Sequence, residues 1–233
     1  MSNWPLVTIC IITYNRLREI KATISALRTH FHYEGPAAWH IADDGSPHGY
    51  IGEILNEFHD MTFTHTDTQR KGWGCNANAA LHFLRDKPYV FFIEDDYVAR
   101  RDLDITSGVA LMESNKDIGL VRYDGVAAHT FTLHLEEADT RIGKFSYCVI
   151  DHASPHLNVY SNRPHLKAKR FHDKYGRYPE RKSLGTTETE FAHRVKDNPS
   201  YPKVAILADG IPTAFEHIGV SWQGSEHDRE TQR

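Results

Sequence analysis

The chain has 233 residues, of which 25% are charged and 40% hydrophobic, a balance typical of a folded protein that buries a core. Lys and Arg number 27 and Asp and Glu number 31, so the net charge is −4 with His neutral, which excludes a globally basic nucleic-acid-binding protein. The three cysteines form no CxxC pair. Since no apolar run reaches membrane length and no signal peptide is visible, we expect a soluble, cytoplasmic protein without an integral membrane segment.

The first half of the chain alternates short apolar runs with segments of helical periodicity. The runs predict strands at 6–12, 39–42, 61–65, 89–93 and 118–123, and the periodicity predicts helices at 17–27, 51–58, 76–84 and 103–112. Strands that alternate with helices require right-handed crossovers and a mainly parallel sheet. The sequence therefore predicts an α/β fold of Rossmann-like type, with a mainly parallel central sheet and flanking helices.

The second half is less regular, and we expect a smaller subregion there. Its patterns predict strands at 129–135, 144–150 and 204–207 and a helix at 186–195, followed by a polar tail over 224–233.

Three polar clusters follow predicted strands directly. They are Asn15, the pair Asp43 and Asp44, and the triplet Glu94-Asp95-Asp96. Ligands of parallel α/β sheets bind outside the carboxyl ends of the strands, so these clusters converge on one edge. Adjacent carboxylates suit a hard cation such as Mg²⁺ or Mn²⁺ that also bridges phosphates. A solvated acidic turn and a tight Asp-Gly turn are the alternatives.

The segment Gly72–Ala77 superficially fits the dinucleotide fingerprint GxGxxA. That fingerprint needs a strand immediately before it in the first βαβ unit, whereas residues 68–71 are polar, and we reject it. Arg70, Lys71 and the start of the following helix are instead candidates to face a phosphate, the alternative being a flexible loop. No Walker A or GxSxG motif occurs, and no aspartate lies in the first strand to serve a phosphohydrolase.

Four segments in the right order resemble the nucleotide-sugar glycosyltransferases of the GT-A fold, specifically family 2. They are residues 8–16 (TICIITYNR), 41–46 (IADDGS), 72–80 (GWGCNANAA) and 91–96 (FFIEDD). The resemblance implies one GT-A domain over 1–233. It would have a nucleotide-sugar-binding half at about 1–128 and an acceptor-binding half, which holds the catalytic base, at about 129–223.

The resemblance also implies which residues bind the donor. It places Asp96 at the metal, Mn²⁺ or Mg²⁺, with His217 as a further metal or diphosphate ligand. Position 94 departs from the family, which has Asp there. The implied nucleotide-binding residues are Thr13, Tyr14, Asn15, Arg16, Asp43, Asp44, Arg70, Lys71, Gly72, Asn76, Glu94 and Asp95.

The stretch 187–190 (TETE) resembles the family's segment that carries the general base. By that match Glu188 is the expected base and Glu190 the fallback. The alternative is a solvated helix N-terminus capped by Thr186 or Thr187. The implied reaction is metal-dependent, inverting transfer of a sugar from a nucleoside diphosphate sugar, foremost a UDP-sugar, to an acceptor hydroxyl.

Residues 163–182 hold eight Lys or Arg against two carboxylates. Interleaved aromatic residues suit an anionic acceptor such as nucleic acid, although an anionic glycan, a lipid-linked acceptor or a plain solvated face remain alternatives. A nucleotide-binding regulator or a degenerate transferase without turnover is the competing function. The expected acceptor-side residues are Asn162, Arg163, Lys167, Lys169 and Arg170.

Overall fold

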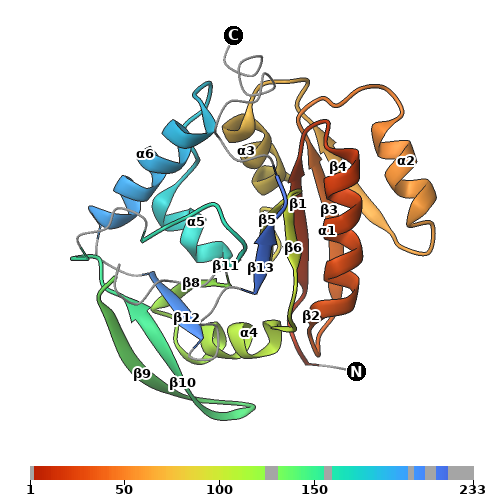
Figure 1. The fold of residues 1–233 in the computed structure, drawn as a ribbon. Coiled ribbons are helices and arrows are strands. Elements are labelled where there is room, and N and C mark those ends of the chain that lie inside the picture. Colours follow the sequence, from red (N-terminus) through yellow and green to blue (C-terminus); the bar gives the residue numbers. More distant parts are fainter. Residues whose placement is uncertain (1–2, 124–130, 155–158, 199–201, 208–213, 220–233) are drawn as a thin grey trace.

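The computed structural model describes residues 3–123, 131–154, 159–198, 202–207 and 214–219. A nine-stranded sheet with the order β4-β3-β1-β5-β11-β8-β12-β10-β9 runs through the molecule, and helices cover both of its faces (Figure 1). This arrangement confirms the α/β class predicted from the alternating pattern.

The first half of the chain forms the parallel part of the sheet. Register pairs Thr13 with Asp43 and Ile12 with Glu94, so the polar strand ends meet at one edge, as predicted. Every residue of the first strand is buried, which explains its unbroken apolar run. The parallel strands are β1 (Val7–Thr13), β3 (Ala37–Asp43), β4 (Phe63–Asp67) and β5 (Tyr89–Glu94).

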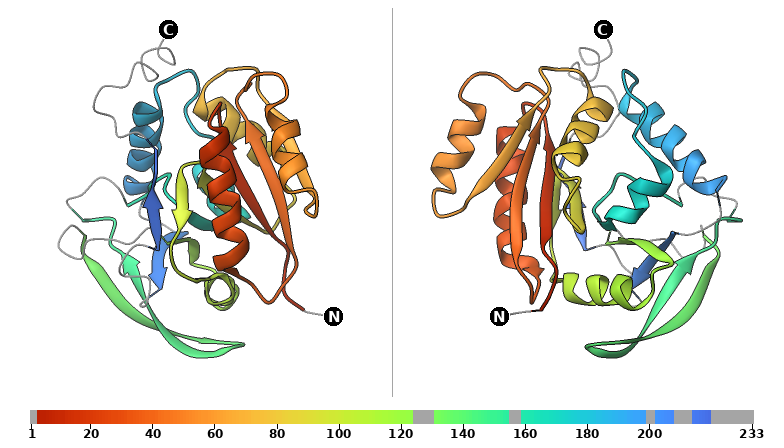
Figure 2. Two further views of the ribbon diagram at one scale, coloured as in Figure 1. Left: turned by 45° about the vertical axis from the view of Figure 1, so that its right-hand side comes forward. Right: turned by 180° about the vertical axis from the view of Figure 1, so that it is seen from behind.

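The second half adds a mixed part. A strand that the sequence pattern did not predict, β11, lies antiparallel between β5 and β8, whereas β12 is parallel to β8. The pair β9 and β10 forms a long ribbon that extends from the body on the side away from α2 (Figure 2). The bounds are β8 (Ile118–Arg122), β9 (Leu133–Thr140), β10 (Gly143–Ile150), β11 (His165–Ala168) and β12 (Lys203–Leu207).

Six helices cover the sheet in the described part of the chain. One apolar cluster packs α1, α2 and α4 on one face, and a second packs α3, α5 and α6 on the other. The bounds are α1 (Leu17–His30), α2 (Tyr50–Glu57), α3 (Trp73–Phe83), α4 (Ile105–Ser114), α5 (Lys169–Tyr175) and α6 (Leu184–Lys196).

Two helices begin earlier than their periodicity predicts. Helix α3 begins directly after Gly72, whose φ of 88° lets the chain turn into the helix. Helix α6 is capped by Ser183, whose hydroxyl accepts from the Thr186 amide at 3.3 Å. Thr186 and Thr187 are therefore not the cap.

Four short strands complete the fold. They are β2 (Phe31–His32), β6 (Tyr97–Ala99), β7 (Leu103–Asp104) and β13 (Phe215–His217). Strand β13 pairs antiparallel with β6, so the end of the described chain returns to the residues just after the acidic triplet (Figure 1). No helix among the described residues is both long and apolar enough to cross a bilayer. Residues 129–130 of a predicted strand and the tail 224–233 lie outside the described residues.

Candidate functional site

Asp95, the middle member of the acidic triplet, ties the ends of β1 and β5 together. Its carboxylate accepts from the Thr13 hydroxyl at 2.7 Å and the Tyr14 amide at 3.4 Å, and it pairs with Arg16 at 3.4 Å. The side chain is buried, and burial raises its pKa to about 7 against the opposing charge of Arg16. Because both oxygens have partners, Asp95 organises the strand edge.

Asp96 keeps one carboxylate oxygen without a partner. Oδ2 accepts from the Arg16 guanidinium and lies 3.1 Å from His217 Nε2, whereas Oδ1 is buried and has no hydrogen-bond partner. The segment after β13 lies close to this carboxylate. A side chain at Gly219 would not fit, because its Cβ would lie 2.3 Å from Asp96 Oδ2. The Ile218 amide also donates to the Asp96 carbonyl at 2.8 Å. His217 is thereby placed beside Asp96, 121 positions away in the sequence.

Glu94 also presents an unpartnered oxygen. Its Oε1 is buried without a hydrogen-bond partner. Burial, followed by the charges of Asp96 and Glu188, raises the pKa of Glu94 well above its usual value. The influence of Glu188 places α6 near the same acidic cluster, so the two halves of the chain meet there.

The aspartates after β3 are held by neighbouring loops. Asp43 accepts from the Ser46 amide at 3.1 Å and hydroxyl at 2.5 Å. Asp44 accepts from the Thr68 hydroxyl at 2.6 Å and from the amides of Lys71 and Gly72 at 2.9 and 2.8 Å. Asp44 therefore fixes the loop that leads into α3.

The Ser46 hydroxyl in turn accepts from the Asn15 amide at 2.8 Å, which joins the turns after β1 and β3. Arg70, on the loop held by Asp44, places its guanidinium 5.3 Å from the centre of the Tyr14 ring. Asn76, expected at the nucleotide, has a fully buried side chain that donates to the Ala42 carbonyl at 2.8 Å and so packs α3 on β3. Its Oδ1 is buried and has no hydrogen-bond partner among the described residues.

Glu188 is held through one oxygen only. Its Oε1 accepts from the Ser161 hydroxyl at 2.9 Å and the Asn162 amide at 2.8 Å. Glu190, two residues further along the same helix, pairs instead with Lys182 on the exposed surface. Ser161 was not singled out from the sequence, and only its position next to Asn162 pointed to it.

A buried hydrogen-bond chain leads away from Glu188. The Tyr160 hydroxyl donates to Asn162 Oδ1 at 2.9 Å and lies 2.5 Å from the Tyr178 hydroxyl. Lys167 Nζ donates to Tyr178 at 3.2 Å and lies 3.7 Å from the centre of the Phe92 ring. The sequence analysis did not assign either tyrosine to such a network.

Two expected acceptor contacts are wrong as surface contacts. Lys167 is 1% exposed, and Arg170 donates to the main-chain carbonyls of Met112 and Ile118. Arg170 therefore ties α5 to α4 and β8, and Lys167 packs β11 against Phe92 and Tyr178. Arg163 and Lys169 are exposed, and Lys169 pairs with Asp173 at 2.6 Å.

The residues beside the acidic triplet fit a divalent cation only in part. Within the described ranges, no three His, Cys, Asp or Glu side chains form a group that could hold a metal ion by themselves. Asp96 does offer an unpartnered oxygen, with His217 next to it. Mg²⁺-type sites often use one or two carboxylates and complete their shell with substrate phosphates and water. Asp96 and His217 fit that kind of site.

The family model described as "Glycosyl transferase family 2" matches residues 8–177. The chain belongs to glycosyl transferase family 2. The match spans β1, the acidic triplet and the segment from Ser161 to β11, so it covers most of the site described above. No curated protein sequence matches the chain.

Solved structures confirm the GT-A fold. The structure titled S. aureus TarS 1-349 in complex with UDP-GlcNAc is 15% identical with a TM-score of 0.65, covering 97% of this chain and 64% of that one. The mannosyltransferase PcManGT from Pyrobaculum calidifontis, in complex with GDP-Man and Mn²⁺, is 13% identical with a TM-score of 0.56, covering 89% and 58%. GalNAc-T7 with UDP, GalNAc and Mn²⁺ is 11% identical with a TM-score of 0.63, covering 89% and 43%. This chain therefore spans less than two thirds of the length of these neighbours.

Proposed function

We propose that the protein is a metal-dependent, inverting glycosyltransferase that moves a sugar from a nucleoside diphosphate sugar, foremost a UDP-sugar, to an acceptor hydroxyl. The observation that carries the proposal is the pair of unpartnered buried oxygens on Glu94 and Asp96, with Glu188 near the same cluster. Family membership and the nucleotide-bound neighbours support it.

The donor would lie along the carboxyl edge of β1, β3 and β5. Thr13 ends β1 there and is followed by Tyr14 and Asn15, and the loop fixed by Asp44 presents Arg70 and Lys71 from the other side. A cation held by Asp96 and His217 would neutralise the charge that develops on the leaving diphosphate. Arg16 pairs with Asp95 and Asp96 and so adds a fixed positive charge beside the proposed cation site.

Glu188 is the proposed general base. Its hydrogen bonds from Ser161 and Asn162 fix Oε1, leaving Oε2 to accept the proton of the attacking hydroxyl. One base and no enzyme nucleophile predict a single displacement, which inverts the anomeric configuration. Glu190 is not proposed as the base, because Lys182 holds it at the surface.

Glu94 lies beside the proposed cation site. Its Oε1 is buried and has no hydrogen-bond partner, and burial raises the pKa of its carboxyl well above the usual value. We place this side chain against an oxygen of the ribose or of the diphosphate.

The acceptor carries a free hydroxyl, and an anionic acceptor remains part of the proposal. Its contacts would come from exposed cations of the 163–182 segment, such as Arg163 and Lys169. If such an acceptor is a polyanion, its affinity falls steeply with salt. A flat salt response would contradict that part of the proposal.

Transfer to water tests the reaction without knowledge of the acceptor. UDP-, GDP- and CDP-sugars are incubated with Mn²⁺, nucleotide release is measured, and proton NMR records the first-formed anomer. We expect one donor class to be hydrolysed with inversion, and Glu188→Gln to lose this activity while Glu190→Gln, the matched control on the same helix, keeps it. Retention of configuration, or full activity in Glu188→Gln, would contradict the proposed mechanism.

A further inference from the structure

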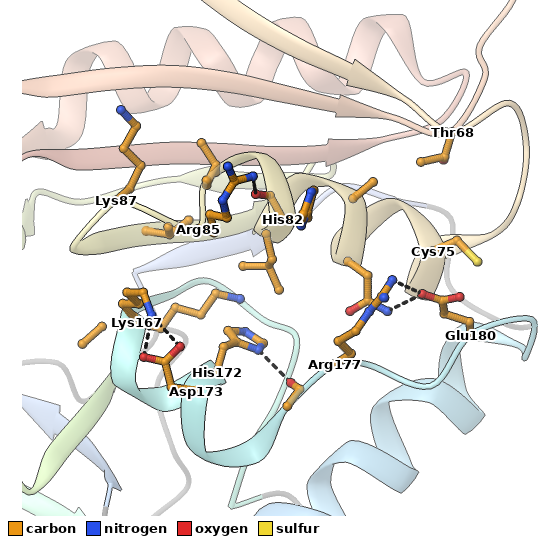
Figure 3. Close-up of a pocket in the computed structure, with 18 of the residues that line it drawn as sticks. Thr68, Cys75, His82, Arg85, Lys87, Lys167, His172, Asp173, Arg177 and Glu180 are labelled. Carbon is orange, nitrogen blue, oxygen red and sulfur yellow. Dashed lines mark hydrogen bonds and ion pairs between the residues drawn. The ribbon is translucent and has the colours of Figure 1, made fainter.

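A pocket lies between α3 and α5, away from the acidic triplet. Its volume is about 580 Å³, and neither Glu94, Asp96, Glu188 nor His217 lines it. Figure 3 shows Arg85 and Lys87 at one end, His82 and His172 on opposite sides of its middle, and Cys75 and Glu180 at the other end. We call it the α3–α5 pocket.

The lining of the α3–α5 pocket carries an excess of positive charge. Two carboxylates line it, and each forms an ion pair: Asp173 with Lys169, and Glu180 with Arg177. In the part of the chain that the structure describes, neither Lys71 nor Lys87 forms an ion pair. The six cationic side chains of the lining are Lys71, Arg85, Lys87, Lys167, Lys169 and Arg177.

Lys167 lies at the floor of this pocket and is buried without a counter-ion. It is 1% exposed, contacts the Phe92 ring and the Tyr178 hydroxyl, and has no carboxylate within ion-pair distance among the described residues. An ammonium removed from water without a negative partner is costly, and burial lowers the pKa of Lys167 well below its usual value. A bound anion would supply the missing partner.

His172, which also lines the pocket, has one ring nitrogen without a hydrogen-bond partner. Its Nδ1 lies 3.0 Å from the Gly176 carbonyl, whereas its Nε2 is buried and has no hydrogen-bond partner. Burial and then the charge of Lys167 lower the pKa of His172 well below the usual value. A bound anion would stabilise the protonated, positively charged forms of Lys167 and His172.

We propose that the α3–α5 pocket binds a small molecule with a phosphate or carboxylate group that reaches Lys167. The volume lies within the range of small-molecule sites, about 300–1,000 Å³, and Val90 and Leu84 offer an apolar wall for the rest of the ligand. The exposed Lys71 and the half-buried Lys87 would attract the anion from solution. The pocket shares Lys71 with the proposed donor site but is lined by none of Glu94, Asp96, Glu188 and His217, and the proposal does not depend on sugar transfer.

Calorimetric titration of pyrophosphate and of citrate, in the presence of a chelator of divalent cations, tests the proposal and distinguishes a phosphate from a carboxylate ligand. We expect at least one of the two to bind with one-to-one stoichiometry. Because Lys167→Met removes the charged group that the anion would contact, it should weaken binding at least about tenfold. The control, Lys174→Met on α5 but outside the lining, should keep the affinity within about twofold.

Two further variants keep the test decisive. Asp96→Asn should leave pyrophosphate binding unchanged, because Asp96 does not line the α3–α5 pocket. If Lys167→Met fails to fold by circular dichroism, Lys87→Ala takes its place and should also weaken binding. The proposal is overturned if neither anion binds, if the pocket variant that folds binds like wild type, or if Asp96→Asn abolishes binding, which would place the anion in the donor site.

Discussion

Replacing Asp44 by Asn should destabilise the protein through one identifiable hydrogen bond. The carboxylate accepts three, two on Oδ1 from Thr68 and Lys71 and one on Oδ2 from the Gly72 amide. An asparagine can keep the first two through its carbonyl oxygen, but its NH₂ group then faces the Gly72 N–H. Since Asp44 is buried, we expect to lose about 2–3 kcal/mol of unfolding free energy, the value of one bond to a charged group and the cost of an unpaired donor.

Urea unfolding followed by circular dichroism measures this loss. The control is Asp86→Asn, whose side chain is 84% exposed and pairs only loosely with Arg85 at 3.7 Å; it should change stability by less than about 0.5 kcal/mol. The Asp44 variant should also bind the donor more weakly, because the loop that carries Arg70 and Lys71 loses its anchor. A change in stability no larger than that of the control would refute the role of Asp44 as the anchor.

Three other results follow from the structure. Glu188→Gln should lower kcat at least about 100-fold while leaving nucleotide affinity within about twofold, since general-base catalysis contributes about 10²–10⁴-fold; turnover and calorimetry together check this, and a change confined to affinity would contradict it. His217→Ala should weaken Mn²⁺-dependent nucleotide binding about tenfold or more, the range for groups that hold or orient a metal, and unchanged metal dependence would remove His217 from the site. The pKa of His40 is lowered to about 4 by burial, so protonation favours the unfolded state. Stability should therefore fall by up to about 3 kcal/mol as pH drops from about 6.5 to about 4, and His40→Gln should flatten that pH dependence in urea titrations; an equally steep loss in the variant would refute the assignment.

The parallel part of the fold follows directly from the sequence. The apolar runs that become β1 and β5 are buried on both faces, and that burial is what an unbroken run of apolar residues indicates. The polar residues after them then had to lie at the carboxyl edge. The sequence therefore predicts that Asp43 and the Glu94–Asp96 triplet lie at one edge, and the strand register agrees.

Strand β11 shows where such reasoning fails. Its four residues include His165 and Lys167, and such polar residues are typical of an exposed loop. Both side chains are nevertheless buried. The strand exists because β5 and β8 pair with it on either side, a tertiary effect that local pattern does not carry. The same effect turned Lys167 from an expected surface contact into the floor of the α3–α5 pocket.

The site was predictable in its acidic residues and less so in their partners. The family-like stretch 187–190 pointed to Glu188, but its hydrogen-bond donors Ser161 and Asn162 lie 27 and 26 residues away in the sequence. His217 reaches Asp96 only because β13 pairs with β6. Such partnerships depend on which distant segments pair in the folded chain, a tertiary effect that local periodicity does not carry.

Asp96 is proposed to support metal-dependent binding of a nucleoside diphosphate. The decisive experiment is calorimetric titration of UDP, GDP and CDP, each with and without Mn²⁺, into wild type and Asp96→Asn. We expect one nucleotide, foremost UDP, to bind wild type only with Mn²⁺, and Asp96→Asn to fold normally but lose this dependence. Binding that ignores both the metal and the substitution, or no binding of any of the three nucleotides to wild type, would contradict it.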